Sequence, residues 1–227
     1  MNLEIFVIFH KSLYWDMYKD LDPDEFDCLR FIAVNENIPK EWDETRFPNV
    51  IKEWELPTYD PKWQEENWAN GGTNHHIIMN RLITAEWSGF VQYDMKFPKG
   101  SVRELYGLMR RNIGVSIKTM NFVNLIGTST YGFQEFPLYN YAISQLDALK
   151  SPNFPLYHVC FMASDHWYEI QSRLLDIDRN LFTFHKRPGD PWYRFPITTE
   201  RTLALACASI LDDIIEYPTI THERLGT

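Results

Sequence analysis

The sequence contains few cysteines and no long apolar run. Cys28, Cys160 and Cys207 are far apart, and none belongs to a CxxC pair. This spacing argues against a disulfide framework and against a structural zinc site, and it is typical of a protein kept in a reducing compartment. No apolar run approaches the roughly 20 residues of a transmembrane helix, and residues 1–11 lack the pattern of a signal peptide. We therefore expect a soluble, cytoplasmic protein without a transmembrane segment.

Basic residues are also in deficit, with 22 Lys and Arg against 31 Asp and Glu. The resulting net charge of −9 and the pI near 5.2 argue against a nucleic-acid-binding surface. An anionic ligand such as a nucleotide would need local cations or a metal ion to offset this charge.

Three common motifs of nucleotide and ester chemistry are missing. The sequence has no GxxxxGK[ST], no GxGxxG after a predicted strand and no GxSxG. P-loop, classical Rossmann and α/β-hydrolase functions therefore lack their characteristic motifs. His75 and His76 are adjacent, so on a helix their rings point about 100° apart and cannot readily share one metal ion.

Aromatic residues, by contrast, are abundant, at 15% of the chain with eight Trp. Aromatic faces stack on sugar rings in carbohydrate-binding proteins, but Trp and Tyr also fill cores and fix loops. The aromatic content is compatible with both uses.

Short apolar runs alternate with amphipathic stretches along the whole chain. Their composition predicts strands over 3–9, 29–34, 89–93, 121–126 and 157–162. Helices are predicted over 74–85, 101–111, 138–149, 166–175 and 200–215, the last capped by Thr198 or Thr199, and 39–60 is expected to be a long surface loop. This alternation predicts one α/β domain over residues 1–227, with a mainly parallel central sheet flanked by helices.

Polar side chains follow four of the predicted strands. They are His10 and Lys11, Asn35 to Asn37, Asp94, and Asp165 with His166. In a parallel sheet the carboxyl ends of the strands lie at one edge, where ligands bind. A carboxylate such as Asp94 at that edge can hold a hard divalent cation, which in turn can hold a diphosphate. Each residue also has an ordinary structural role in capping a turn or helix, but the shared edge favours a binding site.

The order of these elements resembles that of nucleotide-sugar glycosyltransferases of the GT-A type. The resemblance covers most of the chain and more narrowly extends to the N-terminal glycosyltransferase domain of chlorella-virus proteins that build capsid glycans. It rests on the first strand with His10-Lys11, Leu56-Pro57 with Tyr59 and Gln64, the helix ending at Asn80, and the segments 89–95, 161–164 and 199–203. It implies a GT-A-like domain, possibly the N-terminal part of a longer protein, in the host cytoplasm if the source is viral.

The resemblance also implies a metal site. The family has a DxD motif whose last Asp binds Mn²⁺ or Mg²⁺, and the metal holds the diphosphate of the donor. The match here is Gln92-Tyr93-Asp94, so Asp94 takes the metal-binding position while the first Asp of the motif is absent. A second ligand near the end of the domain would be His222 or His185.

The remaining site residues follow from the same resemblance. His10, Lys11, Asn35 and Asn37, together with Tyr93, would bind the nucleotide of a UDP-sugar or similar donor, and the acceptor would be a glycan. An inverting enzyme needs a carboxylate base, for which Asp165 and Glu200 are the candidates, whereas Asp94 acts through the metal. A retaining enzyme needs none, and the resemblance favours retention.

Two other functions stay open on the sequence. The incomplete DxD motif and the aromatic content are compatible with a non-catalytic carbohydrate-binding domain on the same fold. A nucleotidyltransferase would normally have a glycine-rich loop after the first strand, and the segment from His10 to Leu13 contains no glycine.

Overall fold

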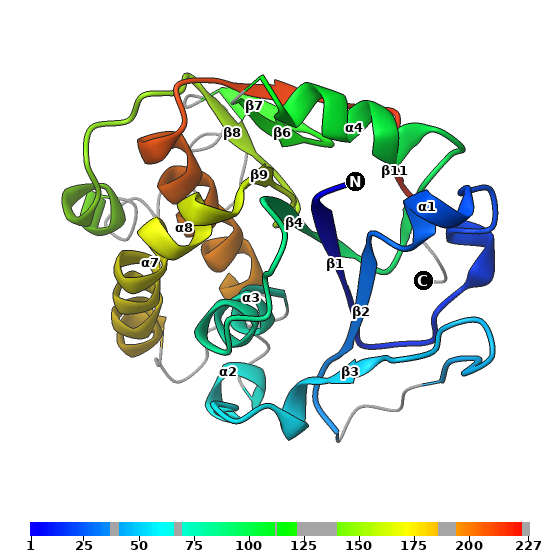
Figure 1. The fold of residues 1–227 in the computed structure, drawn as a ribbon. Helices are drawn as coiled ribbons and strands as arrows, with labels where there is room; N and C mark the ends of the chain where they lie inside the picture. The colour runs from blue at the N-terminus through cyan, green and yellow to red at the C-terminus, as the bar shows by residue number, and fades with distance from the viewer. Residues whose placement is uncertain (37–40, 66–69, 112, 122–139, 186–193, 224–227) are drawn as a thin grey trace.

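The structure is a computed structural model that describes residues 1–36, 41–65, 70–111, 113–121, 140–185 and 194–223. Its centre is a seven-stranded sheet with the order β10-β6-β9-β4-β1-β2-β3 (Figure 1). The strands of this sheet are β1 (Leu3–Phe9), β2 (Leu29–Ala33), β3 (Ile51–Lys52), β4 (Trp87–Gln92), β6 (Gly114–Ser116), β9 (Phe161–Ala163) and β10 (Ile214–Glu216).

The sheet is parallel except for one strand. β1 lies between β2 and β4 and is parallel to both, with Val7 opposite Phe31 and Val91. The outer pairs β2–β3 and β10–β6 are also parallel, whereas β9 runs antiparallel to β4 and β6. All seven residues of β1 are buried, as its uninterrupted apolar run predicts. The predicted α/β fold with a mainly parallel sheet is confirmed.

Helices cover both faces of the sheet. On one face lie α3 (Asn70–Met79), α7 (Ser164–His185) and α8 (Arg194–Ile210), and on the other lie α4 (Ser101–Met109) and the short α1 (Pro23–Phe26) (Figure 1). Alternate residues of β1 enter the two cores, with Phe6 and Ile8 in the first and Ile5 and Val7 in the second. The chain is therefore a three-layer α/β domain.

Several short elements complete the described chain. Two small antiparallel sheets pair β5 (Met95–Lys96) with β11 (Thr221–His222) and β7 (Thr119–Asn121) with β8 (Asn153–Pro155). Residues 140–145 are helical. The remaining short helices are η1 (Trp15–Met17), η2 (Glu53–Glu55) and α2 (Lys62–Glu65).

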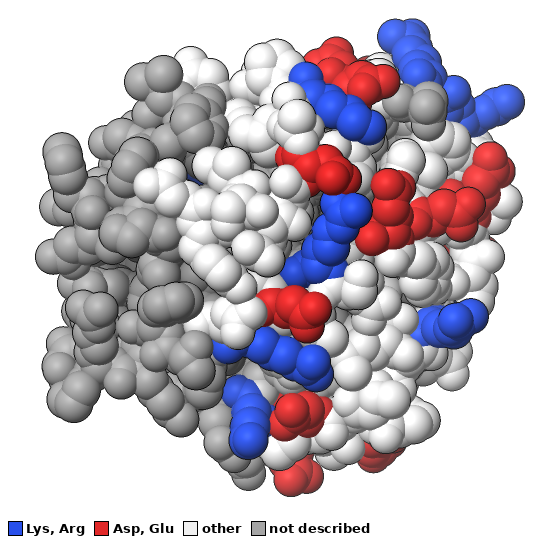
Figure 2. Space-filling view, turned by 90° about the vertical axis from the view of Figure 1, so that its left-hand side faces the viewer, with Lys and Arg blue, Asp and Glu red and all other residues white. Residues whose placement is uncertain are grey.

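Acidic and basic side chains are interspersed on the described part of the face seen in Figure 2. The side chains of Arg173 and Asp147 form an ion pair, and both are about half exposed or more. Such exposed pairs contribute little to stability. Within the described ranges, no helix has both the length and the apolar character needed to cross a membrane.

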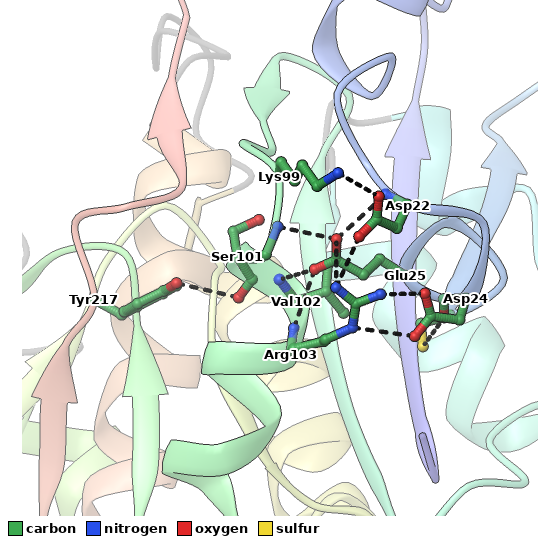
Figure 3. Close-up of polar contacts among 10 residues, drawn as sticks. Asp22, Asp24, Glu25, Lys99, Ser101, Val102, Arg103 and Tyr217 are labelled. Carbon is green, nitrogen blue, oxygen red and sulfur yellow. Dashed lines mark hydrogen bonds and ion pairs between the residues drawn. The ribbon is translucent and has the colours of Figure 1, made fainter.

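On the face of the sheet that α1 and α4 cover, a carboxylate from α1 holds the start of α4 (Figure 3). The Glu25 side chain is fully buried and accepts hydrogen bonds from the backbone N–H groups of Gly100, Val102 and Arg103. These N–H groups have no partner within the helix, and a negative charge there also suits the helix dipole. The Arg103 side chain bonds Asp22 and Asp24 in return. We call Asp22, Asp24, Glu25, Lys99 and Arg103 the α4 clamp.

Two predicted helix starts are wrong. α3 begins at Asn70 and includes Gly71 and Gly72, which precede the helix predicted over 74–85. Close packing of the helix explains why these positions are glycine. A Cβ at Gly72 would lie 2.6 Å from the backbone oxygen of Trp63. α8 begins at Arg194, so Thr199 lies within the helix and caps nothing at its start.

Some predicted strand and helix ends also differ. α8 stops at Ile210, and the last residues of the helix predicted over 200–215 belong to the separate strand β10, Ile214–Glu216. The strand predicted over 157–162 begins only at Phe161, because Tyr157 and His158 form a turn. β3 and η2 interrupt the loop predicted over 39–60. The predicted strand at 121–126 lies outside the described residues beyond Asn121.

Candidate functional site

Asp94 lies in the tight turn after β4, at the carboxyl edge of the sheet. The turn is held on both sides of the residue: the Tyr93 N–H donates to the Ile8 carbonyl oxygen, and the Asp94 carbonyl oxygen accepts from the Glu223 N–H. Pairing of β5 with β11 brings His222 opposite Met95. The C-terminal strand is therefore fixed directly beside Asp94.

The side chains of Asp94 and His222 meet at this edge. Nε2 of His222 lies 3.0 Å from Oδ2 of Asp94, and both side chains are partly exposed. The other carboxylate oxygen, Oδ1, is buried without a hydrogen-bond partner. An unpartnered buried carboxylate oxygen is unusual in a folded protein, and it leaves one strong acceptor available to a ligand.

His10 stands next to this pair at the end of β1. Its ring meets the Tyr93 ring edge-on, with centroids 5.1 Å apart. Burial and the neighbouring charge of Lys11 lower the pKa of His10, although the Asp94 carboxylate opposes this. Burial and the charge of Asp94 raise the pKa of Tyr93 to about 12. His10 thus tends toward the neutral imidazole, which can both donate and accept hydrogen bonds.

The other predicted nucleotide-binding residues are only partly described. Lys11 is exposed after β1, and Asn35 follows β2 at the same edge with a left-handed backbone, φ 51°. Asn37 lies outside the described residues. Tyr93 is 5% exposed, so its ring supports His10 and is not an open contact surface. The carboxyl ends of β1, β2 and β4 therefore bring together His10, Lys11, Asn35 and Asp94, as the sequence predicts.

Asp165 does not share this edge. β9 is antiparallel to β4, and its last residue, Ala163, pairs with the first residue of β4, Trp87. Asp165, two residues further on, is exposed near the opposite end of β4, where the Ser164 N–H donates to the Glu86 carbonyl oxygen. The expectation that Asp165 and His166 lie at the same edge as Asp94 is wrong, because it assumed that every strand runs in one direction.

The reversal of β9 brings its amino end to the Asp94 edge instead. Tyr157 lies just before this strand, and its carbonyl oxygen accepts a hydrogen bond from Nε2 of Gln92. Its N–H donates to Oε2 of Glu200, and its ring lies 5.2 Å from the His222 ring. Glu200, on α8, therefore reaches the site through Tyr157.

Glu200 is a partly exposed carboxylate with both oxygens in use. Oε1 accepts from the Arg201 guanidinium at 2.8 Å, while Oε2 accepts from the Tyr157 N–H at 3.1 Å. Burial raises the pKa of Glu200, and the Arg201 charge and the Tyr157 N–H oppose this. Arg201 itself is 8% exposed, and its Nε has no partner.

Tyr157 and His158 are functional candidates that the sequence analysis missed. Both have left-handed backbones, with φ 60° and 57°. Two successive left-handed residues other than glycine are strained, and such strain concentrates at functional sites. Histidine is among the residues enriched in that conformation but tyrosine is not, and the segment 157–162 has no glycine or asparagine to indicate a turn. Gln92 was noted only as a departure from the DxD motif.

The side chains around Asp94 suit a divalent cation whose coordination shell is completed by a bound ligand. Within the described residues, no group of three His, Cys, Asp or Glu side chains could hold a metal ion by itself. Asp94 has the unpartnered Oδ1, and His222 would offer Nε2 by giving up its contact with Oδ2 of Asp94. Mg²⁺ is commonly held by one or two protein ligands plus substrate phosphates, and imidazole suits other divalent ions. The backbone of His185 ends α7, but its side chain is outside the described part of the structure.

Comparison with known proteins gives a fold but no family. No family model matches the chain, and no curated protein matches it. Among solved structures, it is similar to the apo structure of the bifunctional glycosyltransferase WbbM, at 14% identity and a TM-score of 0.56. The alignment covers 94% of this chain and 44% of that chain. At this identity, the likeness shows a shared fold alone.

A second similar structure is the mannosyltransferase Ktr4p from S. cerevisiae. It aligns at 8% identity and a TM-score of 0.43 over 98% of this chain and 70% of that chain. Its complex with GDP aligns at 9% identity and a TM-score of 0.38.

Proposed function

We propose that the chain is a metal-assisted glycosyltransferase of the GT-A type, which moves a sugar from a nucleotide-sugar donor to a glycan acceptor. The observation that carries this proposal is the Asp94–His222 pair at the carboxyl edge of the sheet, with one carboxylate oxygen unpartnered. The fold shared with WbbM supports the same class of chemistry. The resemblance to enzymes of chlorella-virus glycan synthesis, and UDP as the donor nucleotide, stay predictions.

In this proposal, Asp94 and His222 hold Mn²⁺ or Mg²⁺. The metal, when bound, offsets the charge that develops on the leaving diphosphate. His10 and Lys11 lie at the adjacent strand end, where a neutral imidazole can hydrogen-bond the nucleotide and an exposed ammonium can meet the phosphates. Asn35 supplies amide donors and an acceptor from the end of β2.

We further propose that the reaction retains the configuration of the transferred sugar. An inverting reaction needs a carboxylate that can take the acceptor proton. Both oxygens of Glu200 already accept hydrogen bonds, and Asp165 follows a strand end at the opposite edge. Of the three candidate carboxylates, this leaves Asp94, which the proposal assigns to the metal.

The alternative, a non-catalytic carbohydrate-binding domain, draws support from one feature. Gln92 occupies the place of the first Asp of the DxD motif, and its amide is already bonded to the Tyr157 carbonyl oxygen. A carbohydrate-binding domain should bind a glycan without nucleotide or metal.

The deciding experiment is thermal unfolding of the wild-type chain with UDP, GDP and their sugar conjugates, each with Mn²⁺ or with a chelator. We expect one nucleotide to raise the melting temperature only in the presence of metal. Asp94→Asn should lose this shift, whereas the matched variant Asp165→Asn, at the opposite edge, should keep it. If no nucleotide stabilises the wild type, either with Mn²⁺ or with chelator, the transferase proposal is wrong, and binding to glycan arrays becomes the next measurement.

A further inference from the structure

The turn at Tyr157 and His158 is held from several sides although its backbone is strained. Gln92 on β4 donates a hydrogen bond to the Tyr157 carbonyl oxygen, and Glu200 on α8 accepts one from the Tyr157 N–H. Within the turn itself, the Val159 N–H donates a hydrogen bond to the Leu156 carbonyl oxygen. Strain of this kind persists only where the surrounding structure over-determines the conformation.

A chain of buried polar contacts fixes the other half of the turn. Nε2 of His158 lies 3.0 Å from Oγ1 of Thr199 on α8. The Thr202 hydroxyl donates to Oδ1 of Asp178 on α7 at 2.7 Å and lies 3.0 Å from the Thr199 carbonyl oxygen, with which its one proton is shared. Asp178 in turn lies 2.7 Å from Nε2 of His75 on α3. Three helices therefore hold one strained turn.

The result of this arrangement is the position of one aromatic ring. Tyr157 is partly buried and packs against both hydrophobic cores, and its ring lies against the His222 imidazole with a centroid distance of 5.2 Å. On its other side, Nε2 of His222 meets Asp94. Pairing with β5 fixes the backbone of His222, but a strand of two residues does not set the orientation of its ring, which depends on the side chains around it.

We infer that Tyr157 is a positioning residue, whose ring fixes the His222 imidazole against Asp94, and that the strained turn is kept for this purpose. The inference rests on the proposed function, in which Asp94 and His222 hold the donor through a metal. Residues that orient metal ligands typically change metal affinity or activity by about 10–100-fold when they are replaced.

The first test needs no nucleotide or metal. The imidazole signal of His222 is recorded by ¹H–¹⁵N NMR in the full chain and assigned by its loss in His222→Gln. Loss of the ring current alone moves the chemical shift, so the readout is the line width and the number of signals. We expect Tyr157→Leu to broaden or split the His222 signal, because the imidazole then adopts several orientations, and Tyr157→Phe, which keeps the ring, to preserve one sharp signal. Tyr106→Leu is the matched control, because Tyr106 is a partly buried tyrosine of α4 that lies by Arg110. One sharp His222 signal with unchanged line width in Tyr157→Leu would overturn the inference.

Should Tyr157→Leu fail to fold, Tyr157→Asn replaces it, because asparagine adopts left-handed backbone with little strain. The second test measures binding of Mn²⁺ with UDP or GDP, whichever stabilises the wild type. We expect about tenfold weaker binding in the variants that lack the ring, and wild-type binding in Tyr157→Phe. Equal binding in all variants contradicts the inference but leaves the proposed function intact. Absence of nucleotide binding by the wild type contradicts the proposed function, and the NMR result still decides the role of Tyr157.

Discussion

The α4 clamp and the Asp94 edge both place carboxylates beside cationic or N–H groups, but they differ in completeness. In the clamp, each oxygen of Asp22, Asp24 and Glu25 has a hydrogen-bond or ion-pair partner (Figure 3). At the edge, Oδ1 of Asp94 has none, and the neighbouring turn has two left-handed residues. Satisfied networks stabilise a fold, whereas unpartnered atoms and strain mark a site that is completed by a ligand.

The largest effect that this comparison predicts is at Asp94. Asp94→Asn should weaken metal-dependent nucleotide binding by about 100-fold or more, because the amide is a poor ligand for a hard cation. The free energy of unfolding should change by less than about 1 kcal/mol, because the amide oxygen can keep the contact with Nε2 of His222 and Oδ1 has no partner to lose. Calorimetric titration and urea unfolding of the same preparation measure both quantities. A large loss of stability with intact nucleotide binding would show that Asp94 has a structural role and is not a metal ligand.

Replacement of Glu25 should have the opposite pattern. Glu25→Ala removes the acceptor for three buried or partly buried N–H groups of the α4 start, which should lower the free energy of unfolding by about 2–3 kcal/mol. Nucleotide binding by the folded protein should be unchanged. Glu25→Gln, which keeps one acceptor oxygen, is the control and should lose less. Urea unfolding that gives equal stabilities for all three proteins would show that the clamp is not structural.

The sequence predicts the clamp side of the fold better than the site. β1 is matched residue by residue, because its apolar run is uninterrupted and has no competing period. α4 begins at Ser101 as predicted, since Pro98 and Gly100 mark its start. Local patterns of this kind depend on residues close in the chain, so they can be recognised in the sequence.

The site depends instead on contacts between distant residues. Strand direction has no local signature, so the reversal of β9, which separates Asp165 from Asp94, could not be predicted. The left-handed turn at Tyr157 is imposed by Gln92 and Glu200, which lie 65 and 43 positions away. The contact of Asp94 with His222 spans 128 positions, and the family resemblance offers His222 only as one of two candidate ligands, with His185 as the other.

The buried histidine of the turn predicts a pH effect on stability. Burial and the Arg201 charge lower the pKa of His158 to about 3, from about 6.5 in an unfolded chain. Between these values the unfolded state binds a proton that the folded state does not, so the free energy of unfolding falls as the pH decreases below 6.5. At 1.36 kcal/mol per pH unit, the loss by pH 5 is about 2 kcal/mol.

The variant His158→Gln isolates this effect. Glu200 acts in the opposite sense. Burial raises its pKa, so the folded state binds a proton more readily than the unfolded state, and this residue increases the free energy of unfolding as the pH falls. The difference between wild type and variant cancels Glu200 and the other carboxylates, provided that their pKa values are the same in both proteins. Urea unfolding from pH 7 to 5 should therefore give a wild-type curve that declines more steeply than the curve of His158→Gln. Parallel curves would contradict the neutral state of His158.

The smallest effect is expected within the clamp itself, at Arg103. Its guanidinium bonds Asp22 and Asp24, but the side chain is 46% exposed, so water can replace these partners. Exposed ion pairs contribute little and are screened by salt. Arg103→Met should lower the melting temperature by about 2 °C or less, and 0.5 M NaCl should reduce that difference further. A loss as large as that of Glu25→Ala would mean that the exposed ion pairs, and not the buried carboxylate at the α4 start, hold the helix in place.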